Sequence, residues 1–381
     1  MMTFVKRAGV LFVLSILAFV LVLSFSAESL AWGGRGHHTI CEAASFLVQK
    51  KGLKDYLTSR PHMMGHLCNI PDFYWKSLGP DVGKLGNPTH FIDSELIGLK
   101  VIDIPTDYKK IIADYEGKPS KAKDGSAVFS IPTEFGSAWW RADQFFRRAI
   151  ALGPAWKEAK IPSGFKEEQD ENLAYNKSAY DFVVNLGLMG HFVGDMGQPF
   201  HGTLDYDGWG AGHGGIHAFY EDSGVAAQPY DLTTKVVEAA QKLQKAAASK
   251  VKTEQLKAQF LRPGSVVERM KLLTDSSFVE IQKIYAVDPI IKKSELKKEK
   301  GMDLKTPAER KPIDKTIAKK FEPLVVTQMA RSAALLALLW DEAYEQVGEP
   351  KLAAYKSYKY PFTPDFVAPD YYDIPASAPK K

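Results

Sequence analysis

The chain has 381 residues, of which 45% are hydrophobic and 25% are charged, and its formal net charge at pH 7 is +4. This composition is typical of a globular protein that is long enough for one large domain or two small ones. Because charges of both signs are spread along the chain, the net charge excludes a nucleic-acid-binding surface made by charge alone.

The N-terminus has the pattern of a secretory signal peptide. A basic pair precedes an unbroken apolar run, Ala8 to Phe25, and small residues at positions 29 and 31 fit a cleavage site. We therefore expect residues 1–31 to be removed, Trp32 to begin the mature protein, and the protein to be exported to the periplasm or secreted. Because the apolar run is near the minimum length of a membrane span, an uncleaved anchor is the alternative.

Apolar residues at helical spacing dominate the rest of the chain, and strand signals are weak and short. We therefore predict a mainly α fold with one helical domain over residues 32–348. Turn-rich or charged insertions are expected near 96–131 and 292–312, and an extended C-terminal tail over 349–381. The predicted helices cover residues 37–50, 141–152, 171–196, 232–250, 266–286 and 317–346.

The chain contains two cysteines, Cys41 and Cys68. Export permits a disulfide between them, but their spacing fits two buried free thiols equally well. No CxxC or CxxCH pattern is present, so neither a thiol redox centre nor covalently attached haem is indicated.

Two histidine–carboxylate pairs lie close together in the sequence. His191 and Asp195 are i and i+4 on a predicted helix, which places both side chains on one face. His201 follows a Gly-Gln-Pro break, and His217 and Glu221 form a second i, i+4 pair. The helix is otherwise apolar, and a buried unpaired carboxylate would cost several kcal/mol. A metal ion removes that cost, and imidazole with carboxylate suits zinc.

These residues belong to a longer series of motifs. The series is WGxxGH at Trp32–His37, an aspartate in a turn at Asp72, HFxD at His90–Asp93, HxxxDxxQPxH at His191–His201 and HxxxE at His217–Glu221. In this order the motifs resemble the superfamily that joins zinc-dependent phospholipase C with the single-strand-specific zinc nucleases of the S-one and P-one type. The matching blocks span about 190 residues of the chain, from Trp32 to Glu221.

The resemblance implies three zinc ions and the ligands of each. It also implies that the α-amino group of Trp32 is a ligand, and an amine with an ordinary pKa of about 8 loses its proton readily to a metal. Closely spaced zinc ions activate a shared water, and Asp72 is the candidate to orient or deprotonate it. The implied sets are Asp72, His90, His191 and Asp195; Trp32 through its amino nitrogen and carbonyl oxygen, with His37 and the second oxygen of Asp195; and His201, His217 and Glu221.

The substrate is less sharply indicated. Phe91 and Asp93 could stack on and hydrogen-bond a nucleobase, and Arg35 near the start suits an anionic phosphate. The short WGxxGH spacing favours a nuclease, whereas Glu221 in place of aspartate and Ile216 in place of asparagine favour a phospholipase.

We therefore predict a zinc-dependent phosphoric diester hydrolase of the phospholipase C type. The alternative is a single-strand nuclease of the same superfamily, and the alternative of another class is a non-catalytic exported zinc-binding protein. The partner expected is a phospholipid or single-stranded nucleic acid, and no obligate protein partner is evident. Four histidines remain outside the implied sets and are expected to be structural or surface residues: His38, His62, His66 and His213.

Overall fold

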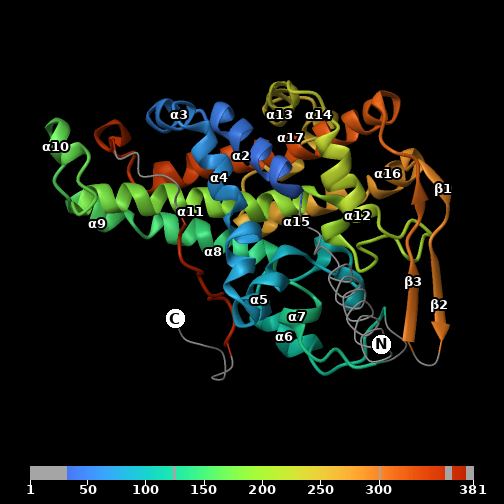
Figure 1. Cartoon of the computed structure of the whole chain (residues 1–381). Helices are drawn as coiled ribbons and strands as arrows, with labels where there is room; N and C mark the ends of the chain where they lie inside the picture. The colour runs from blue at the N-terminus through green and yellow to red at the C-terminus, as the bar shows by residue number, and fades with distance from the viewer. Residues whose placement is uncertain (1–31, 123–125, 300–301, 357–362, 375–381) are drawn as a thin grey trace, which may run out of the picture. The chain divides into compact units, whose positions relative to one another are not determined.

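The computed structural model describes residues 32–122, 126–299, 302–356 and 363–374, and these residues form a mainly helical domain (Figure 1). The predicted signal peptide, 1–31, lies outside the described residues. The α-helices are α2 (Gly33–Leu47), α3 (Lys51–Thr58), α4 (Pro61–Phe73), α5 (Pro80–Gly86), α6 (Tyr108–Tyr115), α7 (Ile131–Glu134), α8 (Ala138–Ile150), α9 (Gly153–Glu158), α10 (Gly164–Glu168), α11 (Ala174–Gly197), α12 (Ile216–Ala218), α13 (Leu232–Ala247), α14 (Lys252–Leu256), α15 (Val266–Phe278), α16 (Ile281–Val287) and α17 (Lys315–Gln346). The 3₁₀ turns are η1 (Trp75–Leu78), η2 (Asn87–His90), η3 (Ser94–Leu96), η4 (Val101–Asp103), η5 (Pro199–Gly202), η7 (Gln259–Leu261) and η8 (Leu352–Ala354), and η6 (Phe219–Gly224) is a π-helix.

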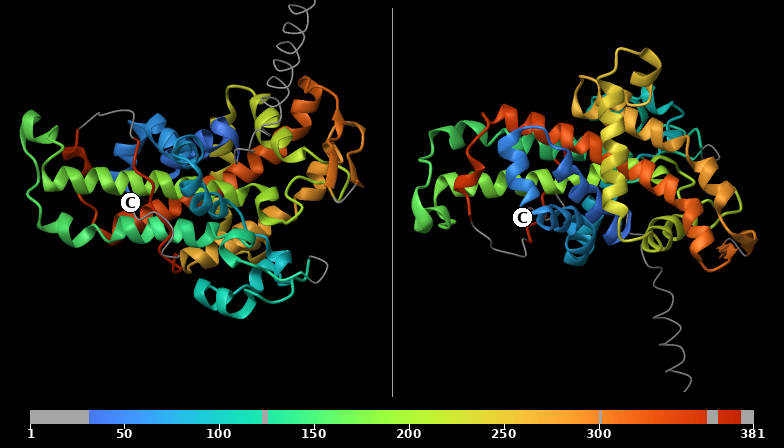
Figure 2. Two further views of the ribbon diagram at one scale, coloured as in Figure 1. Left: turned by 60° about the horizontal axis from the view of Figure 1, so that its bottom comes forward. Right: turned by 90° about the horizontal axis from the view of Figure 1, so that it is seen from above.

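Helix α11 is the centre of the hydrophobic core. Its residues are buried almost without interruption from Phe182 to Gly197, and it packs against α8, α4, α17 and α2. Figure 2 shows α11 and α8 running side by side. The helix predicted over 171–196 is confirmed, because an apolar helix with no polar face can be stable only inside a protein.

Helix α17 also belongs to the core. It is the one helix in the described ranges that is long and apolar enough to cross a membrane, and 67% of its most apolar window is buried in the protein. The indole Nε1 of Trp340 donates a hydrogen bond to the carbonyl of Leu186 in α11, at 3.0 Å. The predicted range 317–346 is confirmed as a helix that packs on α11, α2 and α13.

Two predicted helices differ in their bounds from the sequence pattern. Range 37–50 ends at Leu47, and α3 begins after a short break. Range 266–286 divides into α15 and α16, and Glu280 at the joint is buried beside Arg331 of α17, at 3.3 Å. This ion pair stabilises a break that apolar periodicity does not detect.

The charged segment near 292–312 forms strands rather than an irregular loop. Strands β2 (Glu295–Glu299) and β3 (Met302–Thr306) pair antiparallel, and β1 (Ile290–Lys292) pairs with β4 (Glu309–Arg310). Residues that flank these strands are hydrogen-bonded to a glycine-rich loop, residues 208–215. Ser294 N donates to Gly212 O at 3.0 Å, and Ala308 N donates to Gly214 O at 2.9 Å. The insertion therefore supports the loop between His201 and His217.

The described part of the C-terminal tail packs against the domain. The ring of Phe366 meets the edge of Trp75 at 5.3 Å between centroids, and the carbonyl of Val367 accepts a hydrogen bond from buried Arg141. The tail thereby covers the side of the core where the guanidinium of Arg141 is buried.

Candidate metal centre

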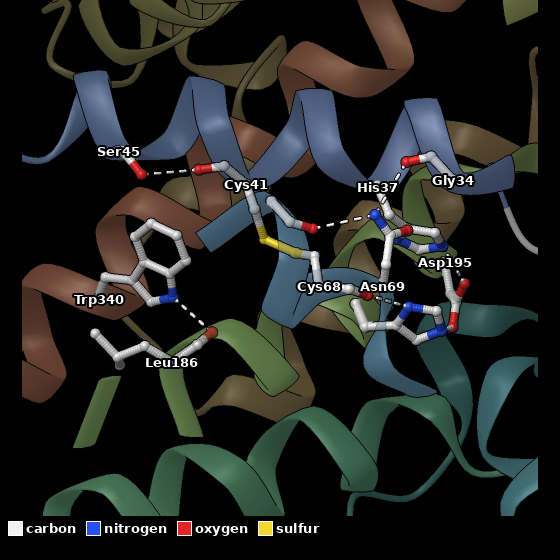
Figure 3. The surroundings of a disulfide bond; sticks show 11 residues. Gly34, His37, Cys41, Ser45, Cys68, Asn69, Leu186, Asp195 and Trp340 are labelled. Carbon is white, nitrogen blue, oxygen red and sulfur yellow. Dashed lines mark hydrogen bonds and ion pairs between the residues drawn. A yellow bond between two sulfur atoms is a disulfide. The ribbon is translucent and has the colours of Figure 1, made fainter. Parts of the chain in front are cut away.

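Helices α2 and α4 are joined by a disulfide between Cys41 and Cys68, whose Cα atoms are 6.4 Å apart (Figure 3). The sequence left the state of these cysteines open, and the structure has them bonded. A side chain at Gly190 of α11 would collide with both sulfur atoms. Because Gly190 has no side chain, α11 can approach the disulfide closely. The turn of α11 that follows Gly190 therefore lies next to α2 and α4.

That turn of α11 carries His191, and two carbonyl groups set the orientation of the buried imidazoles. Nδ1 of His191 lies 2.7 Å from the carbonyl of Cys68, and Nδ1 of His201 lies 2.7 Å from the carbonyl of His90. Because a carbonyl only accepts, each Nδ1 carries the proton and each Nε2 keeps its lone pair. Such partners are typical of histidines that bind metal.

The first predicted ligand set is brought together at this place. Nε2 of His191 lies 2.9 Å from Nδ1 of His90, and both nitrogens lie 3.7 Å from Oδ1 of Asp72. Oδ2 of Asp195 lies 3.1 Å from the His90 nitrogen and 3.4 Å from the His191 nitrogen. Zinc–nitrogen bonds of about 2 Å in a tetrahedral site separate ligand atoms by roughly 3.3 Å. The four side chains therefore surround a space the size of one ion.

The other oxygen of Asp195 faces a different histidine. Its Oδ1 lies 3.4 Å from Nε2 of His37, and that nitrogen lies 4.0 Å from Oδ2 of Asp72. Figure 3 shows His37 and Asp195 together beside the disulfide. The two oxygens of Asp195 thus face different histidines, and His191 belongs to both groups of donors that could hold an ion.

The third predicted set lies across the end of α11. Nε2 of His217 is 3.0 Å from Nε2 of His201 and 2.8 Å from Oε2 of Glu221. His217 lies in α12 and Glu221 in the π-helix η6, and both are buried. The side chain of Gln198 also donates to Glu221, at 2.8 Å.

Trp32 is close to the third set rather than to the set of His37. Its backbone nitrogen donates to Oε2 of Glu221 at 3.1 Å, and its carbonyl accepts from Gly36 N at 3.1 Å, within the first turn of α2. The indole is buried, and its Nε1 donates to the carbonyl of Gly194 at 2.7 Å. The indole therefore anchors the start of α2 to α11 and holds the backbone nitrogen inside the site.

Several polar atoms of the cluster have no hydrogen-bond partner in the described structure. Among the described residues, Oδ1 of Asp195, Oδ2 of Asp72 and both ring nitrogens of His37 are buried without a hydrogen bond. Burial, together with the neighbouring carboxylate of Asp72, raises the pKa of Asp195 well above its ordinary value. Both observations mean that the cluster is suited to hold positive charge between its carboxylates.

The surroundings of four of the five imidazoles favour the neutral form, which is the form that binds metal. Burial is the largest cause that lowers the pKa values of His37, His90 and His191 well below the ordinary value, and it lowers that of His201 to about 4. The pKa of His217 is raised: burial acts to lower it, but the charge and hydrogen bond of Glu221 outweigh that effect. These residues could hold metal ions, because neutral imidazole is a ligand and imidazolium is not.

Asp72 does not lie in a turn, contrary to the sequence interpretation. It is buried in the last turn of α4, a helix that continues through Pro71. The proline suggested a turn, but tertiary packing keeps the segment helical. Lys76 follows one helical turn later, and its Nζ lies 2.8 Å from Oδ1 of Asp72. Lys76 was not among the predicted site residues, although its i, i+4 spacing from Asp72 is a usable signal.

Arg35 is not brought to the cluster. Two residues from His37 on α2, it lies roughly 200° around the helix axis. Its guanidinium donates to the carbonyls of Val225, Gln228 and Pro229 at 2.7–2.8 Å. The predicted role of Arg35 in binding phosphate gains no support from this placement, because its donors are directed at backbone carbonyls.

Phe91 and Asp93 closely follow His90, a predicted ligand. Phe91 is partly buried and Asp93 is buried, with Asp93 N donating to Phe135 O at 2.8 Å. Tyr206, which the sequence analysis did not select, is 53% exposed, and its ring lies 5.7 Å from that of His217. Burial, with the charges of Asp207 and Asp93, raises the pKa of the Tyr206 phenol. An exposed aromatic ring thus stands beside the third ligand set.

Comparisons with known proteins add little to this geometry. No protein-family model matches the chain. A segment is similar to a protein of Bradyrhizobium tropiciagri named a probable serine protease, at 24% identity over 232 residues, covering 46% of this chain and 27% of that protein. The chain therefore spans only about a quarter of the length of that relative.

Proposed function

We propose that the protein is an exported zinc-dependent phosphoric diester hydrolase of the phospholipase C type. The observation that carries the proposal is the arrangement of nine predicted ligand residues around one buried cluster. Eight of them contribute side chains, and Trp32 contributes its backbone nitrogen. Neutral imidazoles and carboxylates at these separations are suited to zinc, and three adjacent donor groups suit more than one ion.

The chemistry that bound zinc supplies is activation of water and stabilisation of charge on phosphate oxygens. The chain supports that chemistry with several of its own groups. Asp72 is positioned by α4 to accept a proton through Oδ2, which makes no hydrogen bond in the described structure. Lys76 places an ammonium group at the same carboxylate, where it can attract an anionic phosphate. The two carboxylate oxygens of Asp195 face different histidines: Oδ1 faces His37, and Oδ2 faces His90 and His191.

Cleavage of the predicted signal peptide would change the backbone at Trp32. Trp32 has φ of 53° and ψ of 3°, a left-handed conformation that is costly for a bulky residue. A chain that begins at Trp32 has no preceding carbonyl, so that cost disappears. Its nitrogen also becomes an amine, placed beside Glu221 and able to bind metal once deprotonated.

A single-strand nuclease is the second candidate, and the aromatic rings near the cluster favour it. Phe91 follows His90 directly and Tyr206 stands beside His217, and bases of a single strand stack on such rings. The name of the distant relative suggests a hydrolase of another kind. In the described part of the chain, none of the five buried histidines hydrogen-bonds a serine hydroxyl, so the cluster offers no serine–histidine pair.

The test is one paired assay on zinc-loaded protein that begins at Trp32. Release of phosphorylated head group from phospholipid is measured beside hydrolysis of single-stranded nucleic acid, with Asp195→Asn as the blank. We expect lipid cleavage that the blank lacks. Cleavage of nucleic acid alone would establish the nuclease and contradict our assignment. No turnover of either, with zinc bound, would support the non-catalytic zinc-binding protein.

A further inference from the structure

A second group of metal-ligating side chains lies outside the buried cluster. His38 and Glu42 are i and i+4 on α2, and His62 and His66 are i and i+4 on α4. From the sequence, these histidines are expected to be structural or surface residues. Two adjacent helices that each present such a pair can direct four donors to one place.

The separations within this group match those of a metal site. Nε2 of His38 lies 3.2 Å from Nδ1 of His62, and that Nδ1 lies 3.5 Å from Oε1 of Glu42. The three ligand atoms all lie within 4.8 Å of one another. Tetrahedral zinc with bonds of about 2 Å separates its ligand atoms by roughly 3.3 Å. A hydrogen bond between the two rings and an ion pair of His62 with Glu42 would account for these two distances one by one, whereas a single bound ion accounts for both.

Neighbouring residues hold two of these donors in position. Oε2 of Glu42 accepts a hydrogen bond from the hydroxyl of Thr233 at 2.9 Å, which leaves Oε1 facing the histidines. The ring of His38 lies against the backbone of α4 at Gly65, where a Cβ atom would come within 2.5–2.6 Å of three ring atoms. A glycine at this position therefore makes room for the ring between the helices.

The group is accessible to solvent, unlike the buried cluster. The side chain of His62 is 79% exposed and that of Glu42 is 17% exposed. An open cavity of about 330 Å³ borders His38 and Glu42. An ion could therefore enter directly from solvent and keep a water molecule as an exchangeable ligand.

We propose that His38, Glu42 and His62 form a separate surface site for a divalent transition-metal ion, and that this ion is zinc. A bound ion would join α2 to α4 from the outer side, as the disulfide joins them from the inner side. Ligands that are already assembled on two packed helices favour binding, because little conformational entropy is lost.

The experiment measures zinc per chain by equilibrium dialysis and elemental analysis on the full exported protein. We expect His62→Ala to bind one zinc ion fewer than the wild type, with unchanged hydrolytic activity. Glu42→Gln should bind the ion more weakly. Lys51→Ala, which removes an exposed side chain on the neighbouring helix α3, is the control and should bind as much zinc as the wild type. Because His62 is exposed, circular dichroism should show that the variant folds normally.

A second pair of variants separates this proposal from the proposed function. Asp195→Asn should lose ions of the buried cluster, and adding His62→Ala should remove one more. Equal zinc binding by Asp195→Asn with and without His62→Ala, or by His62→Ala and the wild type, would overturn the surface site. Neither result depends on whether the buried cluster hydrolyses a phosphodiester.

Discussion

Helix α2 carries two adjacent histidines whose surroundings differ in almost every respect. His37 is fully buried among carboxylates and other histidines, whereas His38 is partly exposed at the edge of α4. One residue step turns a helix by about 100°, so neighbours in sequence can belong to different sites. The number of histidines in a chain therefore says little about its metal sites until the helix face that carries each ring is known.

The two groups also differ in what their assembly costs. The buried donors are held by partners that the fold supplies, such as the carbonyls of Cys68 and His90. They lose hydration on folding, and a cation is needed to offset that loss. The outer donors keep contact with water, so we expect the domain to fold equally well with or without an ion there.

The largest effect should come from Asp195→Asn, because one carboxylate faces two groups of donors. We expect loss of buried zinc and a decrease in kcat/KM of more than about 100-fold, beyond the effect typical of residues that only support a ligand. Zinc content and hydrolysis are measured on the same sample. Asp55→Asn, an exposed carboxylate on α3, is the matched control. Full zinc content in Asp195→Asn would contradict the bridging role.

Retaining one residue before Trp32 should be nearly as damaging. The nitrogen beside Glu221 would remain an amide, which binds zinc poorly, and the left-handed φ would again be required of Trp32. We expect reduced zinc content and activity relative to protein that begins at Trp32. Mass spectrometry of the exported protein shows which form exists. Equal activity of the two forms would rule out the amine as a ligand.

Removing the disulfide should weaken the inner connection between α2 and α4. Replacing both Cys41 and Cys68 by serine releases a cross-link with a sequence separation of 27, and we expect a loss of about 3 kcal/mol in the free energy of unfolding. Denaturant unfolding measures it. The wild type in reductant should match the variant. An unchanged midpoint would show that helix packing alone holds α2 against α4.

Arg35→Ala tests the outer side of α2 against the inner side. We expect a loss of about 1–3 kcal/mol of stability, because several backbone carbonyls lose a charged donor. The activity of the folded protein should not change. Lys76→Ala is the contrasting variant, and it should lower kcat/KM, because an ammonium group is lost beside Asp72. A loss of activity in Arg35→Ala at full stability would restore its predicted role in substrate binding.

Phe91→Ala should have the smallest effect. If the ring contacts substrate beside the ligand His90, its removal raises KM and leaves kcat and zinc content nearly unchanged. Steady-state kinetics on the preferred substrate checks this. Tyr206→Phe keeps the ring beside His217 and should have wild-type kinetics, and a large effect there would mean that the phenol itself participates.

Much of the fold follows from local sequence patterns. Apolar spacing predicted the helices that became α8, α11, α13 and α17, because a helix buries a stripe that repeats with its own period. The i, i+4 pairs of His191 with Asp195 and of His217 with Glu221 were predictable for the same reason. The full ligand set came from a resemblance in motif order rather than from spacing.

Other features depend on which surfaces meet. The sequence alone determined the helical class, the buried character of α11 and the pairs that share a helical turn. Only the tertiary structure decided that Cys41 bonds Cys68, that Asp72 lies in a helix, and that Arg35 faces away from the cluster. It alone placed His62 opposite His38, from a helix that no periodicity had indicated. The physical reason is that periodicity encodes contacts within one helix, whereas contacts between helices depend on packing of residues far apart in the chain.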